Sequence, residues 1–304
     1  MSVSGLWDIL RSEDFQEEIA GALIFENAPS GITPKNITHI RTAHYSVYKV
    51  EDTDGSQHVV RIGVASSADQ LPPDNTGYLG TSTVTPVGQP REFLLAKEFA
   101  AIGAPVIVPT EYIKTNELFD LLWLPFLEND EKEITAKGWV DALTQLRKYE
   151  PKTELPVFTN RVKTMIRLDK VTDGSADYLR AQYDEQMAEL FTIATQWGVV
   201  HGDAHGGNAI RQNGAPVLYD FDTASWAPSV WDFMHLLNRA GTPANAGFTK
   251  DELRSLIPFD DEEIDAALKL RMTAVEAARL YREFTSKDRL KKEKQKRMKN
   301  RKKR

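Results

Sequence analysis

One segment in the second half of the chain constrains the possible folds more than any other part. Residues 199–222 read VVHGDAHGGNAIRQNGAPVLYDFD, so that Asp203 lies five residues before Asn208 and Asp220 lies twelve residues after it. Two short runs of β-forming residues flank the Asn-Gly pair in this segment, which favours a tight β-hairpin. A hairpin of this length would bring the three polar side chains to one edge. The segment therefore predicts a polar site built around a hairpin.

The three side chains are the set that phosphoryl transfer from ATP requires, with one acid to take a hydroxyl proton and an amide oxygen and a second acid to hold Mg²⁺. Asp203 is the candidate catalytic base. Asn208 and Asp220 are candidate ligands of Mg²⁺, which binds a few protein oxygens and keeps several waters. Asp222 is a further candidate ligand, with a loop or salt-bridge role as the alternative. The alternatives for Asp203 and Asn208 are a helix cap and a turn residue.

Length and composition are those of an ordinary globular enzyme. The 304 residues suit one bilobal or two small domains, and 41% hydrophobic and 27% charged residues are typical values. The longest apolar runs, such as residues 121–127, are too short to cross a membrane, and no secretory signal is visible. Because the chain has no cysteine, disulfides, cysteine-ligated zinc and thiol catalysis are excluded. We expect a cytoplasmic protein.

The net charge of −6 conceals a strong asymmetry. Residues 287–304 contain twelve Lys or Arg and two acidic residues, a net charge of +10, and the remaining 286 residues carry −16. A basic terminus of this kind is usually solvated and disordered. The alternatives are an extension of the helix predicted by the periodicity of residues 262–284, and a tail that binds nucleic acid, an acidic partner or the protein's own acidic face.

The first half of the chain predicts β-strands and one helix. Residues 37–64 are rich in alternating and β-branched residues around an Asp-Gly turn, which predicts a three-strand antiparallel meander. Residues 66–89 are rich in Ser, Thr, Pro, Asp and Gly without periodicity, which is typical of a long mobile loop. We expect a helix over residues 90–102 and an apolar strand over residues 118–126.

The second half predicts mainly helices, over residues 135–148, 177–197, 228–237, 251–257 and 261–281. Strands followed by helices indicate an α+β chain of two lobes, with a nucleotide in the cleft between them. The expected organisation is an N-terminal helical extension (1–36), a nucleotide-binding N-lobe (37–127), a helical C-lobe for catalysis and acceptor binding (128–286) and the basic tail (287–304).

The motif HGDAHGGN at residues 201–208, followed by DFD at 220–222, resembles the aminoglycoside phosphotransferase and choline kinase group of the protein-kinase-like superfamily. The resemblance covers about residues 37–240. It implies a bilobal protein-kinase-like fold, in which the N-lobe has an antiparallel β-sheet with one helix and the C-lobe is mostly helical. It also implies that ATP and Mg²⁺ are the cofactors, and that Asp203 and Asn208 belong to the catalytic loop.

The same resemblance implies roles for other residues of the motif. Asp220 is expected to be a metal ligand. His205 belongs to the pattern of the group and is expected to orient the catalytic loop, with contact to a phosphate as the alternative. For His201 we expect a structural role. Asp232 occupies the place of a buried helix aspartate that braces the backbone of the catalytic loop.

The phosphate-binding cation is a departure from the group. Kinase-like catalysis needs a cation on the third strand, held by an acid on the next helix, and Arg61 stands where the group usually has lysine. A guanidinium can bind phosphate through two nitrogens, but it is bulkier than an ammonium. Glu92 is the expected partner of Arg61, and Glu98 is the competing candidate. An exposed strand arginine and a surface glutamate are the alternatives.

The turn expected to cover the phosphates, Thr-Ala-His-Tyr-Ser at residues 42–46, contains no glycine. Protein kinases use a Gly-rich loop there, so this turn favours the small-molecule phosphotransferases. Ser46 is a candidate for contact with a phosphate. At the hinge between the lobes Pro125 has no N–H, so Phe126 or Leu127 is expected to donate a hydrogen bond to adenine.

No motif identifies the phosphate acceptor. The acidic body and the cluster at residues 128–131 suit a cationic acceptor, aminoglycoside-like or an amino alcohol, and a solvated acidic surface is the alternative. Three hypotheses follow: a kinase of a small-molecule hydroxyl, a kinase of Ser or Thr in a peptide or protein with the tail as docking element, and a nucleotide-binding pseudo-enzyme or adaptor. The intact set of Asp203, Asn208 and Asp220 argues against the third.

Overall fold

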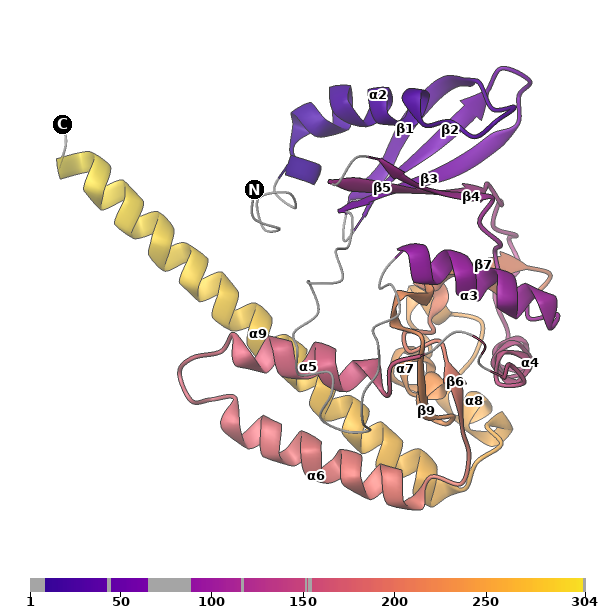
Figure 1. The fold of residues 1–304 in the computed structure, drawn as a ribbon. Coiled ribbons are helices and arrows are strands. Elements are labelled where there is room, and N and C mark those ends of the chain that lie inside the picture. The colour runs from indigo at the N-terminus through magenta and orange to yellow at the C-terminus, as the bar shows by residue number, and fades with distance from the viewer. Residues whose placement is uncertain are drawn as a thin grey trace.

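The computed structural model describes residues 9–42, 45–64, 89–115, 118–150, 152 and 155–302, without the side chains of 17, 89 and 287–302. The described chain forms two lobes, a sheet lobe and a mostly helical lobe, which confirms the predicted fold class (Figure 1). The loop predicted over residues 66–89 lies outside the described residues except at its last position. Among the described helices, none combines the length and the apolar character needed to cross a membrane.

The N-lobe is a five-stranded antiparallel sheet in the order β1-β2-β3-β5-β4. Its strands are β1 (Pro34–Thr42), β2 (Ser46–Asp52), β3 (Gln57–Val64), β4 (Glu111–Thr115) and β5 (Phe119–Pro125). The predicted meander is β1, β2 and β3, and β1 begins three residues earlier than expected. A proline is tolerated at that position because it is the first residue of an edge strand, where no ladder hydrogen bond from its nitrogen is needed.

The two faces of this sheet have different partners because successive side chains of a strand point to opposite faces. On one face, Val60, Ile62 and Trp123 are buried against a helical segment, a π-helical turn (Phe15–Ile19) that continues into α2 (Ala20–Glu26). On the other face, alternate residues such as Val59 and Arg61 point toward the C-lobe. The strand period therefore aims Arg61 at the cleft between the lobes.

Helix α3 (Gln89–Ala101) lies between the sheet and the C-lobe (Figure 1). Its residue Phe99 packs edge-on against Phe221 of the DFD motif, with ring centroids 5.0 Å apart. Leu95 and Phe99 belong to the same buried core as the C-lobe helices. The helix that carries Glu92 is therefore packed against the DFD motif and held at a set position beside it.

The C-lobe helices are α4 (Ala136–Leu146), α5 (Thr159–Asp169), α6 (Asp177–Ile193), α7 (Trp231–Arg239), α8 (Lys250–Leu256) and α9 (Asp261–Lys302). Their core contains the large buried side chains Trp139, Tyr183 and Trp231. Helix α5 was not predicted. Helix α6 ends four residues earlier than predicted, since Thr195 bonds to Glu263 and Trp197 begins a strand.

Two short antiparallel strand pairs frame the HGDAHGGN motif. Strand β6 (Trp197–Val200) pairs with β9 (Ser225–Pro228), and β7 (Ala209–Gln212) pairs with β8 (Ala215–Leu218). The second pair is the predicted hairpin, and its turn residues Asn213 and Gly214 have φ angles of 53° and 81°. Both residues of a type I′ turn need positive φ, which explains the Asn-Gly pair.

Helix α9 continues without a break through the basic segment to Lys302. Its last turns project away from the C-lobe in Figure 1. Three alternatives were given for residues 287–304, and the described backbone agrees with one of them, an extension of the last helix. Its earlier turns pack on α5 and α6 through Ala277, Leu280 and Phe284.

Candidate active site

A cleft of about 580 Å³ lies between the two lobes. Six of the predicted site residues line it, namely Arg61, Phe126, Leu127, Asp203, Asn208 and Asp220. The other four predicted residues, Ser46, Glu92, His205 and Asp222, do not line it. Apolar side chains from both lobes, including Val59, Leu124, Ile107 and Ile210, form the part of the cleft nearest the hinge. A flat apolar base fits between such walls, with polar groups at the other end of the cleft.

The hinge offers one of its two predicted donors to a ligand. The N–H of Phe126 donates to the carbonyl oxygen of Gln57 at 3.2 Å, which secures the hinge to β3. Leu127 is therefore the better candidate for a hydrogen bond to adenine. Phe126 instead offers its ring, over which the Lys49 ammonium lies 4.1 Å from the centroid.

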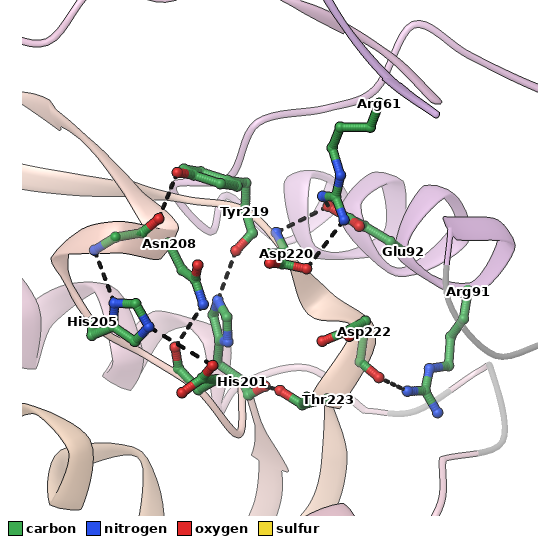
Figure 2. A network of polar contacts seen from close by, with 12 residues as sticks. Arg61, Arg91, Glu92, His201, His205, Asn208, Tyr219, Asp220, Asp222 and Thr223 are labelled. Carbon is green, nitrogen blue, oxygen red and sulfur yellow. Dashed lines mark hydrogen bonds and ion pairs between the residues drawn. The ribbon is translucent and has the colours of Figure 1, made fainter. Parts of the chain in front are cut away.

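Arg61 is buried between two acids (Figure 2). Its Nη1 lies 2.9 Å from Glu92 Oε1 and its Nη2 lies 3.2 Å from Asp220 Oδ1. Glu92 Oε1 also accepts a hydrogen bond from the backbone N–H of Asp220 at 2.9 Å. The structure thus pairs Arg61 with Glu92, while Glu98, the competing candidate, accepts from the Tyr149 hydroxyl.

The charges of this cluster depend on one another. Burial disfavours the Arg61 guanidinium, but Glu92 and Asp220 outweigh burial and raise its pKa. Burial raises the pKa of Glu92, and Arg61 opposes that rise. The pKa of Asp222 is raised by burial and by Asp220, although Lys163, 3.9 Å away, opposes the rise. Asp220 and Asp222 are therefore two carboxylates that repel each other at the edge of the cleft.

The residues predicted to hold Mg²⁺ fit that ion chemically. Asn208 donates its Nδ2 hydrogen to the Asp203 carbonyl oxygen at 3.0 Å, which leaves its Oδ1 as the amide atom for a cation. Within the described residues, no group of three or more acidic, histidine or cysteine side chains could form a metal site by itself. Mg²⁺ does not need one, since it commonly takes one or two carboxylates together with substrate phosphates. A cation would also offset the repulsion between Asp220 and Asp222.

Ser46 lies outside this arrangement. It is buried, its hydroxyl donates to the Leu10 carbonyl oxygen at 3.1 Å, and it lies 2.9 Å from Thr42 Oγ1. Contact with a phosphate would require this hydroxyl to leave both partners. Its role as the N-lobe phosphate contact is therefore not supported by the geometry, because the side chain points to the buried face of the sheet lobe.

The backbone of the catalytic loop is held by buried side chains. The two carboxylate oxygens of Asp232 accept hydrogen bonds from the N–H groups of His201 and Gly202, both at 2.8 Å. The His201 ring nitrogen Nε2 lies 2.9 Å from the Tyr219 carbonyl oxygen, and Thr223 Oγ1 donates to the His201 carbonyl oxygen at 2.9 Å. His201 and Asp232 therefore have the structural surroundings that were expected.

Two glycines of the motif are required by close backbone contacts. Gly202 has a φ of 81°, and a Cβ atom there would lie 2.4 Å from the Thr223 carbonyl oxygen. At Gly206 a Cβ would lie 1.7 Å from the Ala244 carbonyl oxygen. No L-residue with a side chain fits at either position without moving the backbone. The glycine content of HGDAHGGN thus follows from packing of the loop.

Asp203 is flanked by two histidines. His235 Nδ1 lies 2.8 Å from Asp203 Oδ1, and His205 Nε2 lies 3.7 Å from Asp203 Oδ2. His205 Nδ1 accepts from the N–H of Gly207 at 2.9 Å, so its proton is on the nitrogen that faces Asp203. Burial opposes the carboxylate charge, yet the two histidines outweigh burial and hold the Asp203 pKa well below its usual range.

Sequence reasoning missed His235. It is 3% exposed, and burial lowers its pKa to about 4 although Asp203 opposes the shift. A neutral imidazole with Nδ1–H toward the carboxylate leaves Asp203 ionised. The signal in the sequence was its position on the apolar face of α7, three residues after Asp232, because residues three apart on a helix face the same side.

Comparison with known proteins agrees with this geometry. A family model described as the phosphotransferase enzyme family matches residues 43–267. The comparison with curated proteins gives no match. Among solved structures, an amicoumacin kinase in complex with AMP-PNP and Ca²⁺ is similar at 16% identity, with a TM-score of 0.65 over 90% of this chain and 94% of that chain.

Two further structures have the same fold. The choline kinase LicA from Streptococcus pneumoniae is 14% identical, with a TM-score of 0.58 over 88% of this chain and 90% of that one. The aminoglycoside phosphotransferase APH(3'')-Id from Streptomyces rimosus is 14% identical, with a TM-score of 0.55 over 84% of this chain and 98% of that one. At such low identity these likenesses establish the fold, and the family model establishes membership. The chain belongs to the phosphotransferase enzyme family.

Proposed function

We propose that the protein is an ATP- and Mg²⁺-dependent phosphotransferase that transfers the γ-phosphate to a hydroxyl of a small molecule. The observation that carries this proposal is the position of the ionised Asp203 carboxylate in the same cleft as Asn208, Asp220 and Arg61. A hydroxyl placed beside Asp203 would have a base on one side and the phosphate groups on the other.

Each residue has a distinct role in the proposed reaction. Asp203 accepts the proton of the acceptor hydroxyl while the oxygen of that hydroxyl bonds to the γ-phosphorus. The bond between the γ-phosphorus and the β,γ-bridging oxygen breaks, and ADP leaves with the electron pair. Arg61 binds the phosphates and Glu92 positions Arg61. Asn208 and Asp220, with Asp222 nearby, would hold Mg²⁺, which would neutralise phosphate charge.

The proposed acceptor is small. An aminoglycoside-like molecule or an amino alcohol fits the expectation from the acidic body, while Ser or Thr of a peptide is the second candidate and a pseudo-enzyme or adaptor the third. The acidic cluster at residues 128–131 supports such a cationic acceptor less than expected. The Asp130 carboxylate accepts from the N–H of Asn213, which braces the β7–β8 hairpin, whereas Glu128 accepts from Gln212 only through its backbone carbonyl oxygen and lines the cleft.

The remaining expectations concern the location of the protein in the cell and the role of its basic tail. A supply of ATP makes the cytoplasm the proposed location. The basic residues of 287–304 are the proposed contact for an acidic partner or nucleic acid.

Mass spectrometry of incubations with ATP tests the proposed function directly. Panels of amino-sugars, amino alcohols, hydroxy acids and peptides are scored for the addition of one phosphate, with and without Mg²⁺. We expect a modified small molecule that requires Mg²⁺ and disappears with Asp203→Asn. Asp141→Asn, an exposed acid on α4 paired with Lys137, is the matched control and retains activity. Phosphorylation that persists in Asp203→Asn would overturn the proposal.

A further inference from the structure

Helices α5 and α7 each carry an arginine one turn after a residue that contacts an acid of the site. On α5, Lys163 Nζ lies 3.9 Å from Asp222 Oδ1, and Arg167 follows one turn later on the same helix face. On α7, His235 contacts Asp203, and Arg239 follows one turn later on the same face. Both helices thus carry an arginine in their last turn, on the helix face that contacts an acid of the site.

A third helix adds another arginine at this place. Helix α9 packs against both α5 and α7, and Arg271 comes from the part of α9 within the C-lobe. Arg271 interacts electrostatically with Asp203, Arg167 and Arg239. Arg167, Arg239 and Arg271 are therefore electrostatic neighbours on three packed helices, and Arg271 also interacts with Asp203. We call them the arginine cluster.

The arginine cluster has no ion-pair partner within the described part of the chain. No acidic group of a described residue lies within 4.0 Å of these three guanidinium groups, whereas the nearby Arg161 and Arg180 pair with Asp184 and Asp169. Arg271 Nε is buried and has no hydrogen-bond partner. Burial and the neighbouring arginines lower the pKa of Arg271 to about 10, although Asp203 opposes the shift.

Unpaired charges in a half-buried place are costly, and like charges repel one another as well. An oxyanion would offset both costs, because a guanidinium binds a carboxylate or a phosphate through two parallel hydrogen bonds. We propose that the phosphate acceptor carries an anionic group, a carboxylate or a phosphate, near its reacting hydroxyl, and that Arg167, Arg239 and Arg271 bind this group. The inference rests on the proposed function, since it names the class of acceptor for the same site.

This arrangement opposes the expectation of a cationic acceptor. That expectation came from the total charge of the body and from the cluster at residues 128–131, in which Asp130 bonds to the hairpin and Glu128 lines the hinge end of the cleft. The charge next to Asp203 on the C-lobe side is positive. An anionic group bound there would place the hydroxyl of the acceptor within reach of the Asp203 carboxylate.

Binding of inorganic phosphate tests the arginine cluster without knowledge of the acceptor. The nucleotide cleft is saturated with Mg²⁺ and a non-hydrolysable ATP analogue, and phosphate binding is measured by calorimetry and by the rise in Tm, with chloride at equal ionic strength as reference. We expect Arg167→Gln, Arg239→Gln and Arg271→Gln each to weaken phosphate binding about tenfold or more. Malonate in place of phosphate tests the carboxylate arm.

Arg279→Gln is the matched control, because Arg279 is an exposed arginine of α9 paired with Glu276 and Glu283. It should bind phosphate as the wild type does. Equal binding in the control and in all three cluster variants, or no binding in the wild type, would overturn the inference. Each single variant removes a repelling charge, so folding is expected to be retained, and the wild-type result does not depend on any variant.

Turnover separates a failed inference from a failed function. The wild type is offered hydroxy acids, sugar phosphates, neutral polyols and amino alcohols with Mg²⁺-ATP, and ADP formation and product mass are followed. Phosphorylation of hydroxy acids or of sugar phosphates supports the inference and identifies the anion. Preference for amino alcohols or neutral polyols overturns the inference and retains the proposed function. Absence of Mg²⁺-ATP binding in a direct nucleotide-binding assay counts against the proposed function itself.

Discussion

The two sides of Asp203 both carry buried or half-buried arginine, but in opposite electrostatic states. On the nucleotide side, Arg61 is 5% exposed and lies within 3.2 Å of two carboxylates. On the acceptor side, the arginine cluster has no described acid within ion-pair distance. A paired arginine is already held in position by its acids, whereas an unpaired cluster retains its full charge for a ligand.

The comparison separates two roles of arginine: Arg61 is held in position by its acids, and the arginine cluster is proposed to recognise a ligand. Glu92 binds both Arg61 and the backbone of Asp220, so one acid aligns the proposed phosphate-binding cation with the proposed metal-binding carboxylate. Among the described side chains no acid pairs with Arg271 in this way, and its electrostatic neighbours include two other arginines. We therefore expect substitutions on the nucleotide side to alter KM for ATP and those on the acceptor side to alter KM for the acceptor.

Asp203 lies between the two sides and gives the largest predicted effect. Replacing Asp203 by alanine removes the base, so kcat should fall by about 10²- to 10⁴-fold, the usual contribution of a general base. Binding of nucleotide should persist, because Arg61 and the hinge remain. Steady-state kinetics together with nucleotide titration measure both quantities. An unchanged kcat would remove Asp203 from the chemistry.

Arg61 tests the nucleotide side alone. Arg61→Ala should raise KM for ATP about tenfold or more through loss of charge-assisted hydrogen bonds. It also leaves Glu92 buried without its cation, so Arg61→Lys is the variant that retains charge and fold. Lys35→Ala, an exposed cation of β1 paired with Glu51, is the matched control. If KM for ATP stayed at its wild-type value in both Arg61 variants, another cation would have to hold the phosphates.

His235 gives a pH dependence whose sign follows from its pKa. Burial lowers this pKa from 6.5 to about 4, so the unfolded chain binds a proton that the folded chain excludes as the pH falls from 6.5 toward 4. The free energy of unfolding should therefore decrease over that window by up to about 3 kcal/mol relative to its value at neutral pH. Urea unfolding at several pH values measures the slope.

The matched variants for His235 separate positioning from packing. His235→Asn retains a donor near the place of Nδ1 and should preserve much of the kcat, while the pH slope between 6.5 and 4 becomes shallower. His235→Phe fills the volume without a donor and should lower kcat more than it changes KM for ATP. Equal kcat values in the two variants would show that His235 only fills space.

Removal of residues 287–304 should have the smallest effect on the cleft. The truncation leaves the packed residues Leu280 and Phe284 in place, so small-molecule phosphorylation should stay within about twofold of wild type while α9 keeps its contacts with α5. Assays with a small acceptor and with a peptide, on both chains, check this. Loss of peptide phosphorylation alone would identify the tail as a docking arm. Loss of both activities would show that the tail is needed for a stable fold.

Local patterns predicted the parts of the molecule that local interactions decide. The Asn-Gly turn requires positive φ at both of its residues, so β7 and β8 could be placed from the sequence. The alternation of β3 could be seen as well, although its burial on one side depends on α2. Helix α5 and the pair of β6 with β9 were missed because a short strand or a weakly apolar helix acquires its stability from a distant partner.

The sequence by itself indicated the proposed reaction type, because Asp203, Asn208 and Asp220 lie close enough along the chain for a single hairpin to bring them together. The resemblance to the kinase-like group also predicted Glu92 as the partner of Arg61, and the structure confirms that pairing. Only the tertiary structure showed that His235 faces Asp203, that Ser46 faces away from the cleft and that the arginine cluster has no ion-pair partner among the described residues. Those properties depend on the packing of α5, α7 and α9, and the order of residues along any one helix does not reveal which charges meet in space.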